Sequence, residues 1–155
     1  MTDVVLPEDA AIAFNSMLDG WNTANGVRFV SASADRVVAE MTVGPMHLQP
    51  YGIVHGGVYC GLVETVCSVG AALSVLEHGR SAVGLDNQTS FLHAVRDGLL
   101  RVTATPLSRG RRSQLWEAKV ESIRPEKTRV VATGRVRLLC LDADAVLAGE
   151  SVAVK

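Results

Sequence analysis

The second half of the chain alternates apolar and polar residues with a period of two. Between residues 114 and 123, Trp116, Ala118 and Val120 alternate with charged side chains. An alternation of this kind is typical of β-strands that bury one face and expose the other. Residues that favour turns separate this segment from neighbours with similar patterns. The pattern predicts four consecutive strands, at residues 82–93, 100–107, 114–123 and 129–141.

The N-terminal part of the chain predicts a short helix followed by a hairpin. Pro7, Glu8 and Asp9 are favoured in the first turn of a helix, and Gly20 is a suitable end for it. We therefore expect a helical lead-in over residues 1–24. Apolar and polar residues alternate again on either side of a turn. This alternation predicts two antiparallel strands, at residues 27–31 and 36–43.

Residues 56–77 form the longest apolar segment, and Glu64 is the only charged residue between positions 58 and 76. The length would allow a membrane span, but an acid in the middle, several small residues and the lack of flanking basic clusters argue against one. Outside a membrane, a helix that is apolar on all sides must be enclosed by other parts of the protein. One such helix and five or six antiparallel strands predict an α+β fold in which the sheet curls around the helix.

The composition fits one domain and excludes several functions. The chain has 155 residues, so we expect a single domain over residues 1–155, with a tail at residues 142–155 that frays after Leu147. Hydrophobic residues make up 48%, which excludes a disordered chain. The formal net charge of −1 lacks the basic excess that nucleic-acid binding needs.

The cysteines and the first residues bear on location and on metal binding. Cys60, Cys67 and Cys140 are an odd number without C-x-x-C spacing, which is typical of reduced core thiols in a cytoplasmic protein. The first residues are not basic, so they do not predict a signal peptide. No set of Cys, His and Asp has the spacing of zinc ligands, and no nucleotide-binding glycine motif is present. We expect a cytoplasmic protein without a metal or another cofactor.

The candidate chemistry lies where a loop meets the long helix. Gly56 and Gly57 carry no Cβ, so a ligand can approach the backbone, and the free N–H groups of a helix start favour a negative oxygen. This suits the carbonyl of a thioester as it becomes an oxyanion. Glu64 lies two turns further along the same face, with Ser68 one turn beyond it. Glu64 is either functional or a structural acid that pairs with backbone groups or with an Arg of a second subunit.

The segment QPYGIVHGGVYCGLVETVCS, at residues 49–68, closely resembles the active-site segment of hotdog-fold acyl-CoA thioesterases. The most similar group is the 4-hydroxybenzoyl-CoA thioesterase type with Glu on the helix, together with its 1,4-dihydroxy-2-naphthoyl-CoA thioesterase relatives in the PaaI-like superfamily. The similarity extends with few gaps over residues 27–141. HGG alone is a weak signal, but Gln six residues before the His and Glu nine residues after it raise its specificity.

This resemblance implies a hotdog fold, a long helix wrapped by a curved antiparallel sheet, and hydrolysis of an aromatic or medium-chain acyl-CoA. In the family the helix Glu is the nucleophile or general base, and the N–H of the first Gly polarises the thioester carbonyl. These roles carry over to Glu64 and Gly56. The family's Gln and His line and orient the site, which implies Gln49 and His55. Ser68 stands at a Ser/Thr position that supports substrate or water.

Further residues are implied in substrate binding. Relatives often have Asn-His and Arg-Pro pairs in the strand after the helix, where this chain has Ser90-Phe91 and His93-Ala94. The departure leaves the acyl group open, although Phe91 would make the pocket more apolar. Gly57 is expected beside the thioester. A basic turn is either solvated or binds the CoA phosphates, as a neighbouring turn of the family does: Arg109, Gly110, Arg111 and Arg112.

The family builds its site from two subunits, so the resemblance also implies a homodimer or a dimer of dimers. The main alternative to hydrolysis is a noncatalytic module that binds or senses acyl-CoA. Retention of Glu64 favours catalysis, because a binding module gains nothing from a desolvated acid beside a thioester. A hydratase or dehydratase on the same fold is a third possibility, but it uses a different pattern of His and acid.

Overall fold

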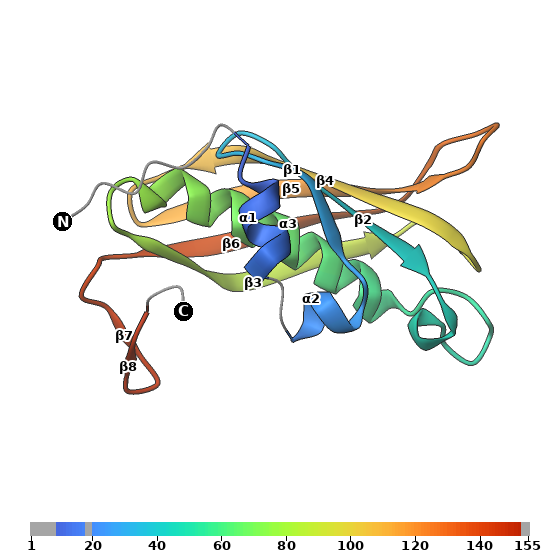
Figure 1. Ribbon diagram of the computed structural model, residues 1–155, viewed down its shortest axis with the longest axis horizontal. Helices are drawn as coiled ribbons and strands as arrows, with labels where there is room; N and C mark the ends of the chain where they lie inside the picture. The colour runs from blue at the N-terminus through green and yellow to red at the C-terminus, as the bar shows by residue number, and fades with distance from the viewer. Residues whose placement is uncertain (1–8, 18–19, 153–155) are drawn as a thin grey trace.

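Six antiparallel strands form one curved sheet around a single long helix (Figure 1). The computed structural model describes residues 9–17 and 20–152. The strands lie in the order β1-β2-β4-β5-β6-β3, and each neighbouring pair is antiparallel. The helix α3 (Gly56–Leu76) packs against every strand from β2 to β6. The predicted α+β architecture, with a helix enclosed by a sheet, is therefore confirmed.

Every predicted strand is present, although some boundaries differ. The strand predicted at residues 100–107 is longer, because its pairing with the next strand continues to Arg109, which lies opposite Gln114. An irregularity in register between Pro106 and Ser108 does not end this pairing. The strands are β1 (Arg28–Ala32), β2 (Val37–Val43), β3 (Ser81–Phe91), β4 (Gly98–Arg109), β5 (Ser113–Ile123) and β6 (Arg129–Leu141).

The lead-in contains two short helices, α1 (Ala11–Met17) and α2 (Trp21–Ala24), where the sequence predicted one. Pro7 and Glu8, which were expected to open the first helix, lie outside the described residues. One Asp9 carboxylate oxygen accepts hydrogen bonds from the N–H groups of Ala11, at 2.9 Å, and Ala32, at 3.0 Å. Asp9 thus stabilises the start of α1 and ties it to β1.

The C-terminal tail is more ordered than the sequence predicted. Residues 146–151 form a hairpin of two short strands, β7 (Val146–Leu147) and β8 (Glu150–Ser151), below the main sheet in Figure 1. Its turn has positive φ at Ala148 and Gly149, which is the geometry of tight hairpins. Ser81 at the start of β3 donates a hydrogen bond to the Val152 carbonyl, at 3.1 Å. The expected fraying after Leu147 is therefore wrong as far as residue 152.

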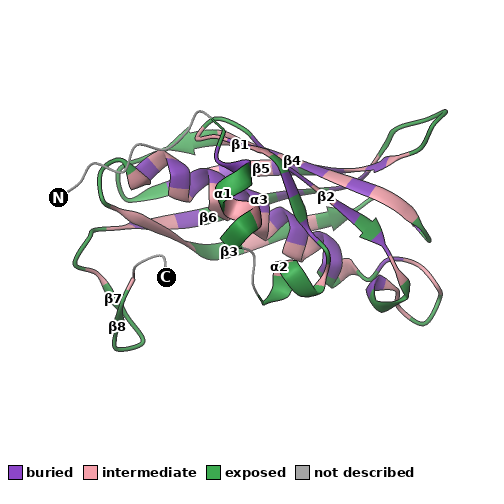
Figure 2. Cartoon of the chain, in the orientation of Figure 1, coloured by how far each residue is buried: buried purple, intermediate pink, exposed green. Residues whose placement is uncertain are grey.

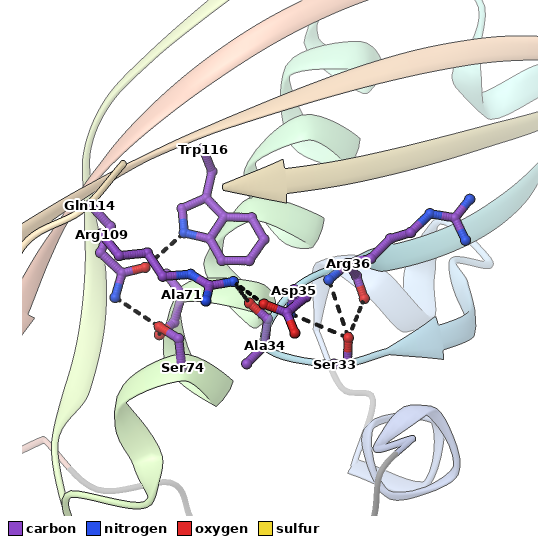
Figure 3. A network of polar contacts seen from close by, with 9 residues as sticks. All are labelled: Ser33, Ala34, Asp35, Arg36, Ala71, Ser74, Arg109, Gln114 and Trp116. Atoms are coloured by element: carbon purple, nitrogen blue, oxygen red, sulfur yellow. Dashed lines mark hydrogen bonds and ion pairs between the residues drawn. The ribbon is translucent and has the colours of Figure 1, made fainter. Parts of the chain in front are cut away.

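The sheet packs most tightly on α3 through Trp116. This side chain is fully buried, and its ring occupies the space that a Cβ on Gly70 would take. The indole N–H donates to Gln114, at 2.7 Å, and the Gln114 amide donates to the Ser74 hydroxyl, also at 2.7 Å. Ser74 in turn donates to the Ala71 carbonyl (Figure 3). These contacts fasten β5 to the C-terminal half of the helix.

By length and hydropathy alone, α3 would pass as a membrane span. In the structure it is the core helix, and buried residues occur along most of its length (Figure 2). Five strands cover this helix, so its apolar side chains are buried within the protein and need no lipid.

The change from Gly70 to Ala tests the packing of Trp116. At an exposed helix position, Gly to Ala stabilises by about 1 kcal/mol. Here the added Cβ would overlap the indole, so we expect Gly70→Ala to lower the free energy of unfolding by about 1–3 kcal/mol. Urea denaturation measures this change. A stabilised variant would contradict the close approach of β5 to α3.

Candidate active site

A loop over residues 44–55, with the short 3-10 helix η1 (Pro45–His47), delivers the chain to the start of α3. His55 is the N-cap residue, and its Nδ1 accepts a hydrogen bond from the Gly57 N–H, at 2.9 Å. Since Nδ1 accepts, the proton of a neutral His55 is on Nε2. The Gly56 N–H has no hydrogen-bond acceptor in the described part of the chain. The cap therefore uses one glycine N–H and leaves the preceding one available to a ligand.

Side chains within and beyond this loop hold its shape. The side-chain oxygen of Gln49, Oε1, accepts a hydrogen bond from the Tyr51 N–H, at 2.6 Å. Arg96 donates to the carbonyls of Tyr51 and Gly52, each at 3.0 Å. One end of the Gln49 amide thus orders the loop, and its NH₂ group remains to orient a substrate.

A cavity of about 280 Å³ lies beside the helix start. The Phe91 ring covers Gly56, where a Cβ would lie only 2.6 Å from a ring carbon. Tyr59 packs against Phe91 with 5.9 Å between ring centroids, and burial raises the pKa of its phenol to about 12. Tyr59 is therefore neutral near pH 7. The cavity is lined by Gln49, Ile53, Val54, Gly56, Tyr59, Phe91, Leu92, His93 and Ala94.

Glu64 lies further along α3 and faces the edge strand β3. Its Oε1 accepts a hydrogen bond from the Ser68 hydroxyl, at 3.3 Å, as the sequence suggested. Its Oε2 accepts one from the side-chain amide of Asn87 on β3, at 3.0 Å. Oε1 also lies so close to Gly84 that a Cβ there would overlap it. The carboxylate is thus enclosed by two neutral donors and one strand backbone.

No ion pair in the described residues involves Glu64. A carboxylate has about four lone-pair positions, of which the two hydrogen bonds occupy two. No Arg of the described chain pairs with Glu64, and the alternative that it pairs with an Arg of a second subunit stays a prediction. Glu64 therefore keeps free lone pairs with which it can bind a water or attack a carbonyl carbon.

The predicted residues fall into two groups along α3. Gln49, Gly56 and Phe91 line the cavity at the helix start, and Glu64 and Ser68 meet further along. Gly56 and Glu64 are eight residues apart, which is about 12 Å along a helix. The glycine pair and the acid are therefore not in contact within one chain.

Gly61 makes room for a neighbouring helix, and Ser90 departs from its expected surroundings. The space beside Gly61 is filled by the Trp21 ring, so the small residue there makes room for α2 and not for a ligand. Ser90 points to the outer face of the sheet, where it lines a separate polar hollow of about 620 Å³ with Gln88 and Thr133. The expected contact of Ser90 with the acyl group is therefore not formed within the chain, because strand alternation turns this side chain away from α3.

The basic turn is held largely by structural contacts. Arg109 donates to the Ala34 carbonyl, pairs with Asp35 at 2.6 Å and lies over the Trp116 ring (Figure 3). Gly110 is part of the turn between β4 and β5. Arg80, which follows α3, donates to the Arg111 carbonyl, at 2.8 Å.

The position of this turn limits what it can bind. The contact with Arg80 places it near the C-terminal end of α3, whereas Gly56 begins the helix. The Arg111 and Arg112 side chains are exposed and remain available to an anion. Within one chain they lie near the opposite end of α3 from Gly56.

Cys67 does not offer a competing nucleophile. Burial, together with the nearby charges of Glu64 and Glu117, raises the pKa of the Cys67 thiol far above neutral pH. All three cysteines are free, as the sequence predicted. Among the described residues, no group of three potential metal ligands lies together.

Asn87, Thr89 and Gly84 were not among the predicted site residues. The alternation of Asn87 and Thr89 with Gln88 and Ser90 shows that they share one face of a strand. It does not show which face meets Glu64, because an irregularity in β3 between Gly84 and Asp86 shifts the register.

The long helix enclosed by a six-stranded antiparallel sheet is the hotdog fold, which this chain shares with solved thioesterase structures. Residues 51–129 match the thioesterase superfamily. The Mycobacterium tuberculosis protein Rv1847, whose name designates it an esterase, is 38% identical over 143 residues, which cover 91% of this chain and 95% of that protein. The chain therefore belongs to the thioesterase superfamily and is a thioester hydrolase.

Solved structures and a further relative agree with this assignment. The Rv1847 structure superposes with a TM-score of 0.76 at 39% identity, covering 79% of this chain and 97% of that one. The thioesterase HI1161 from Haemophilus influenzae gives 0.78 at 29% identity, covering 86% and 91%. A 1,4-dihydroxy-2-naphthoyl-CoA hydrolase of Listeria monocytogenes is 34% identical over 95 residues, which cover 61% of this chain and 76% of that protein.

Variants of His55 separate helix capping from a role toward substrate. His55→Ala removes the acceptor for the Gly57 N–H, so we expect the free energy of unfolding to fall by about 1 kcal/mol. His55→Asn supplies a favoured N-cap and should restore stability. Urea denaturation gives the stabilities, and the hydrolysis rate of His55→Asn shows whether capping alone suffices. Wild-type stability of His55→Ala would contradict the capping role.

Proposed function

We propose that this thioesterase hydrolyses an acyl-CoA to the free acid and CoA, with Glu64 as the nucleophile or general base. The observation that carries the proposal is the surroundings of Glu64, whose carboxylate accepts hydrogen bonds from two neutral donors and pairs with no cation among the described residues. A carboxylate in this state can attack a carbonyl carbon or accept a proton from water. The Gly56 N–H, which has no partner in the described chain, stabilises the oxyanion.

The reaction uses water as its only co-substrate. As a base, Glu64 takes a proton from water while the hydroxyl oxygen bonds to the thioester carbon. As a nucleophile, it forms an anhydride and releases CoA thiolate, and water then hydrolyses the anhydride. In both routes the carbonyl oxygen gains negative charge at Gly56, the C–S bond breaks, and the thiolate takes up the proton that water releases and leaves as CoA. Glu64 and Gly56 supply this chemistry without a metal or cofactor.

We propose an aromatic or medium-chain acyl group. Phe91, Tyr59 and Leu92 form part of the wall of the cavity beside Gly56, and they suit an apolar group or a ring. A relative named for a dihydroxynaphthoyl-CoA substrate supports the aromatic choice. Thiol release from a panel of aryl-, phenylacetyl- and fatty acyl-CoAs tests this proposal.

We propose that the working unit is a homodimer or a dimer of dimers in the cytoplasm. Gly56 and Glu64 lie about two helical turns apart, so a second copy would complete the site. The edge strand β3 is largely exposed over residues 84–91 (Figure 2), and Leu85 is 55% exposed. An exposed edge of this length favours pairing with another strand.

Light scattering tests the assembly. We expect a mass of two or four times the 16.5 kDa of the chain at micromolar concentration. A mass near 16.5 kDa in a protein that hydrolyses acyl-CoA would contradict a shared site.

Replacement of Glu64 by Gln tests the proposed function. Glutamine keeps the size and can still accept from Ser68, but it can neither attack as a carboxylate nor take a proton from water. We expect single-turnover hydrolysis to slow by about a hundredfold or more, the scale of a positioned base. The affinity for a nonhydrolysable acyl-CoA should stay close to that of the wild type.

Two milder variants serve as comparisons. Gln49→Ala and Ser68→Ala remove orienting hydrogen bonds and should reduce the rate less than Glu64→Gln does. A near wild-type rate in Glu64→Gln would make Glu64 a structural acid. Tight binding by a wild-type protein that hydrolyses no acyl-CoA would favour the noncatalytic binding module.

A further inference from the structure

We propose that Asn87 and Thr89 are positioning residues that hold the Glu64 carboxylate in its reactive orientation. The inference rests on the proposed role of Glu64 in hydrolysis. Both residues are half-buried and lie two positions apart on β3, so their side chains share the face toward α3. They form a chain of hydrogen bonds that runs from Thr89 through Asn87 to Glu64.

The side-chain amide of Asn87 uses both of its N–H donors and one of the two lone pairs on its oxygen. Its Nδ2 donates to Glu64 Oε2, at 3.0 Å, and to the Cys60 carbonyl, at 3.1 Å. A backbone carbonyl can only accept, which places the NH₂ group on the helix side. Its Oδ1 then faces Thr89, whose hydroxyl donates to it at 2.6 Å. Asn87 therefore has one orientation and bridges the helical turn that ends at Glu64.

The surroundings of Thr89 leave room for this arrangement. Thr89 lies opposite Gly134 on β6, and a Cβ on Gly134 would come within 2.7 Å of the Thr89 hydroxyl oxygen. Val63 of α3 would lie equally close to that Cβ, at 2.8 Å. The missing side chain at position 134 thus lets Thr89 fit between the sheet and the helix while it orders Asn87.

A bulge in β3 brings a second contact to Glu64. Gly84 pairs with Leu138 and Asp86 pairs with Arg137, so Leu85 is an extra residue without a partner in this pairing. In a regular strand, residues three positions apart, such as Gly84 and Asn87, face opposite sides of the sheet. The extra residue of the bulge turns both of them to the same side. Gly84 and Asn87 therefore both meet Glu64.

This arrangement orients a base without neutralising it. An Arg or Lys at the position of Asn87 would pair with the carboxylate and compete with its reaction. A neutral amide fixes Oε2, and Ser68 and Gly84 lie at Oε1. Rotation of the carboxylate is restricted while two of its lone-pair positions stay open.

The test uses variants of β3 that retain size. Thr89→Val removes only the hydroxyl, so we expect kcat to fall about tenfold, the scale of one orienting hydrogen bond. Thr89→Ser should restore kcat to within about threefold of the wild type. Asn87→Leu should lower kcat by about a hundredfold, the scale of a misplaced reacting group. KM should change by less than about twofold in each case, since Glu64 acts on the reaction step.

The Glu64→Gln background separates positioning from general damage. Asn87→Leu should cause little further loss of kcat in that background, because its effect passes through the carboxylate. The matched control is Gln88→Leu on the neighbouring outward-facing position, which should keep wild-type kinetics. Equal losses from Asn87→Leu in both backgrounds, or an unchanged kcat in Thr89→Val, would overturn the proposal.

Crystal structures supply a readout that does not depend on activity. The hydrogen bond between Asn87 Nδ2 and Glu64 Oε2 should persist in Thr89→Ser and be lost in Thr89→Val. If it persists in Thr89→Val, Thr89 is not a positioning residue, whatever the kinetics. If the wild type hydrolyses no acyl-CoA, or Glu64→Gln keeps its rate, the proposed function fails while this structural result still decides whether Thr89 orders the carboxylate.

Discussion

The close packing of the sheet against α3 is the constraint on which the rest of the structure depends. The helix is apolar almost throughout, so it must be covered, and strands can approach it closely only where side chains are missing. Trp116 occupies the space beside Gly70, and Thr89 and Val63 crowd Gly134. Each glycine lets the sheet and the helix meet without a void, which conserves dispersion contacts in the core.

The same constraint creates the site. Glu64 is the one acid within the buried part of the helix, and it faces the edge strand where a bulge and Gly84 leave room for a carboxylate. Its carboxylate accepts hydrogen bonds from Ser68 and Asn87, and among the described residues it has no cationic partner. The helix start is organised separately, since His55 caps Gly57 and leaves the Gly56 N–H open. The fold thus places an acid and an unpaired backbone N–H of the described chain on one helix, at two positions along it.

Local patterns allowed much of this to be predicted from the sequence. Strand alternation and the apolar run gave the architecture, and helical spacing related Ser68 to Glu64 correctly. Contacts between distant segments were not predictable in this way. The hydrogen bond from Asn87 depends on a bulge, and the capture of Arg109 by Asp35 joins positions 74 residues apart. Ser90 was expected at the acyl group, but the register of β3 turns it to the outer face.

The most direct measurement of the central claim is a crystal structure of Glu64→Gln with a bound acyl-CoA. The account predicts that the thioester oxygen lies about 3 Å from the Gly56 nitrogen, the distance of a hydrogen bond. It also predicts that the side chain at position 64 of a second copy faces the thioester carbon. A thioester bound away from both residues, for example in the polar hollow beside Gln88 and Thr133, would contradict the account.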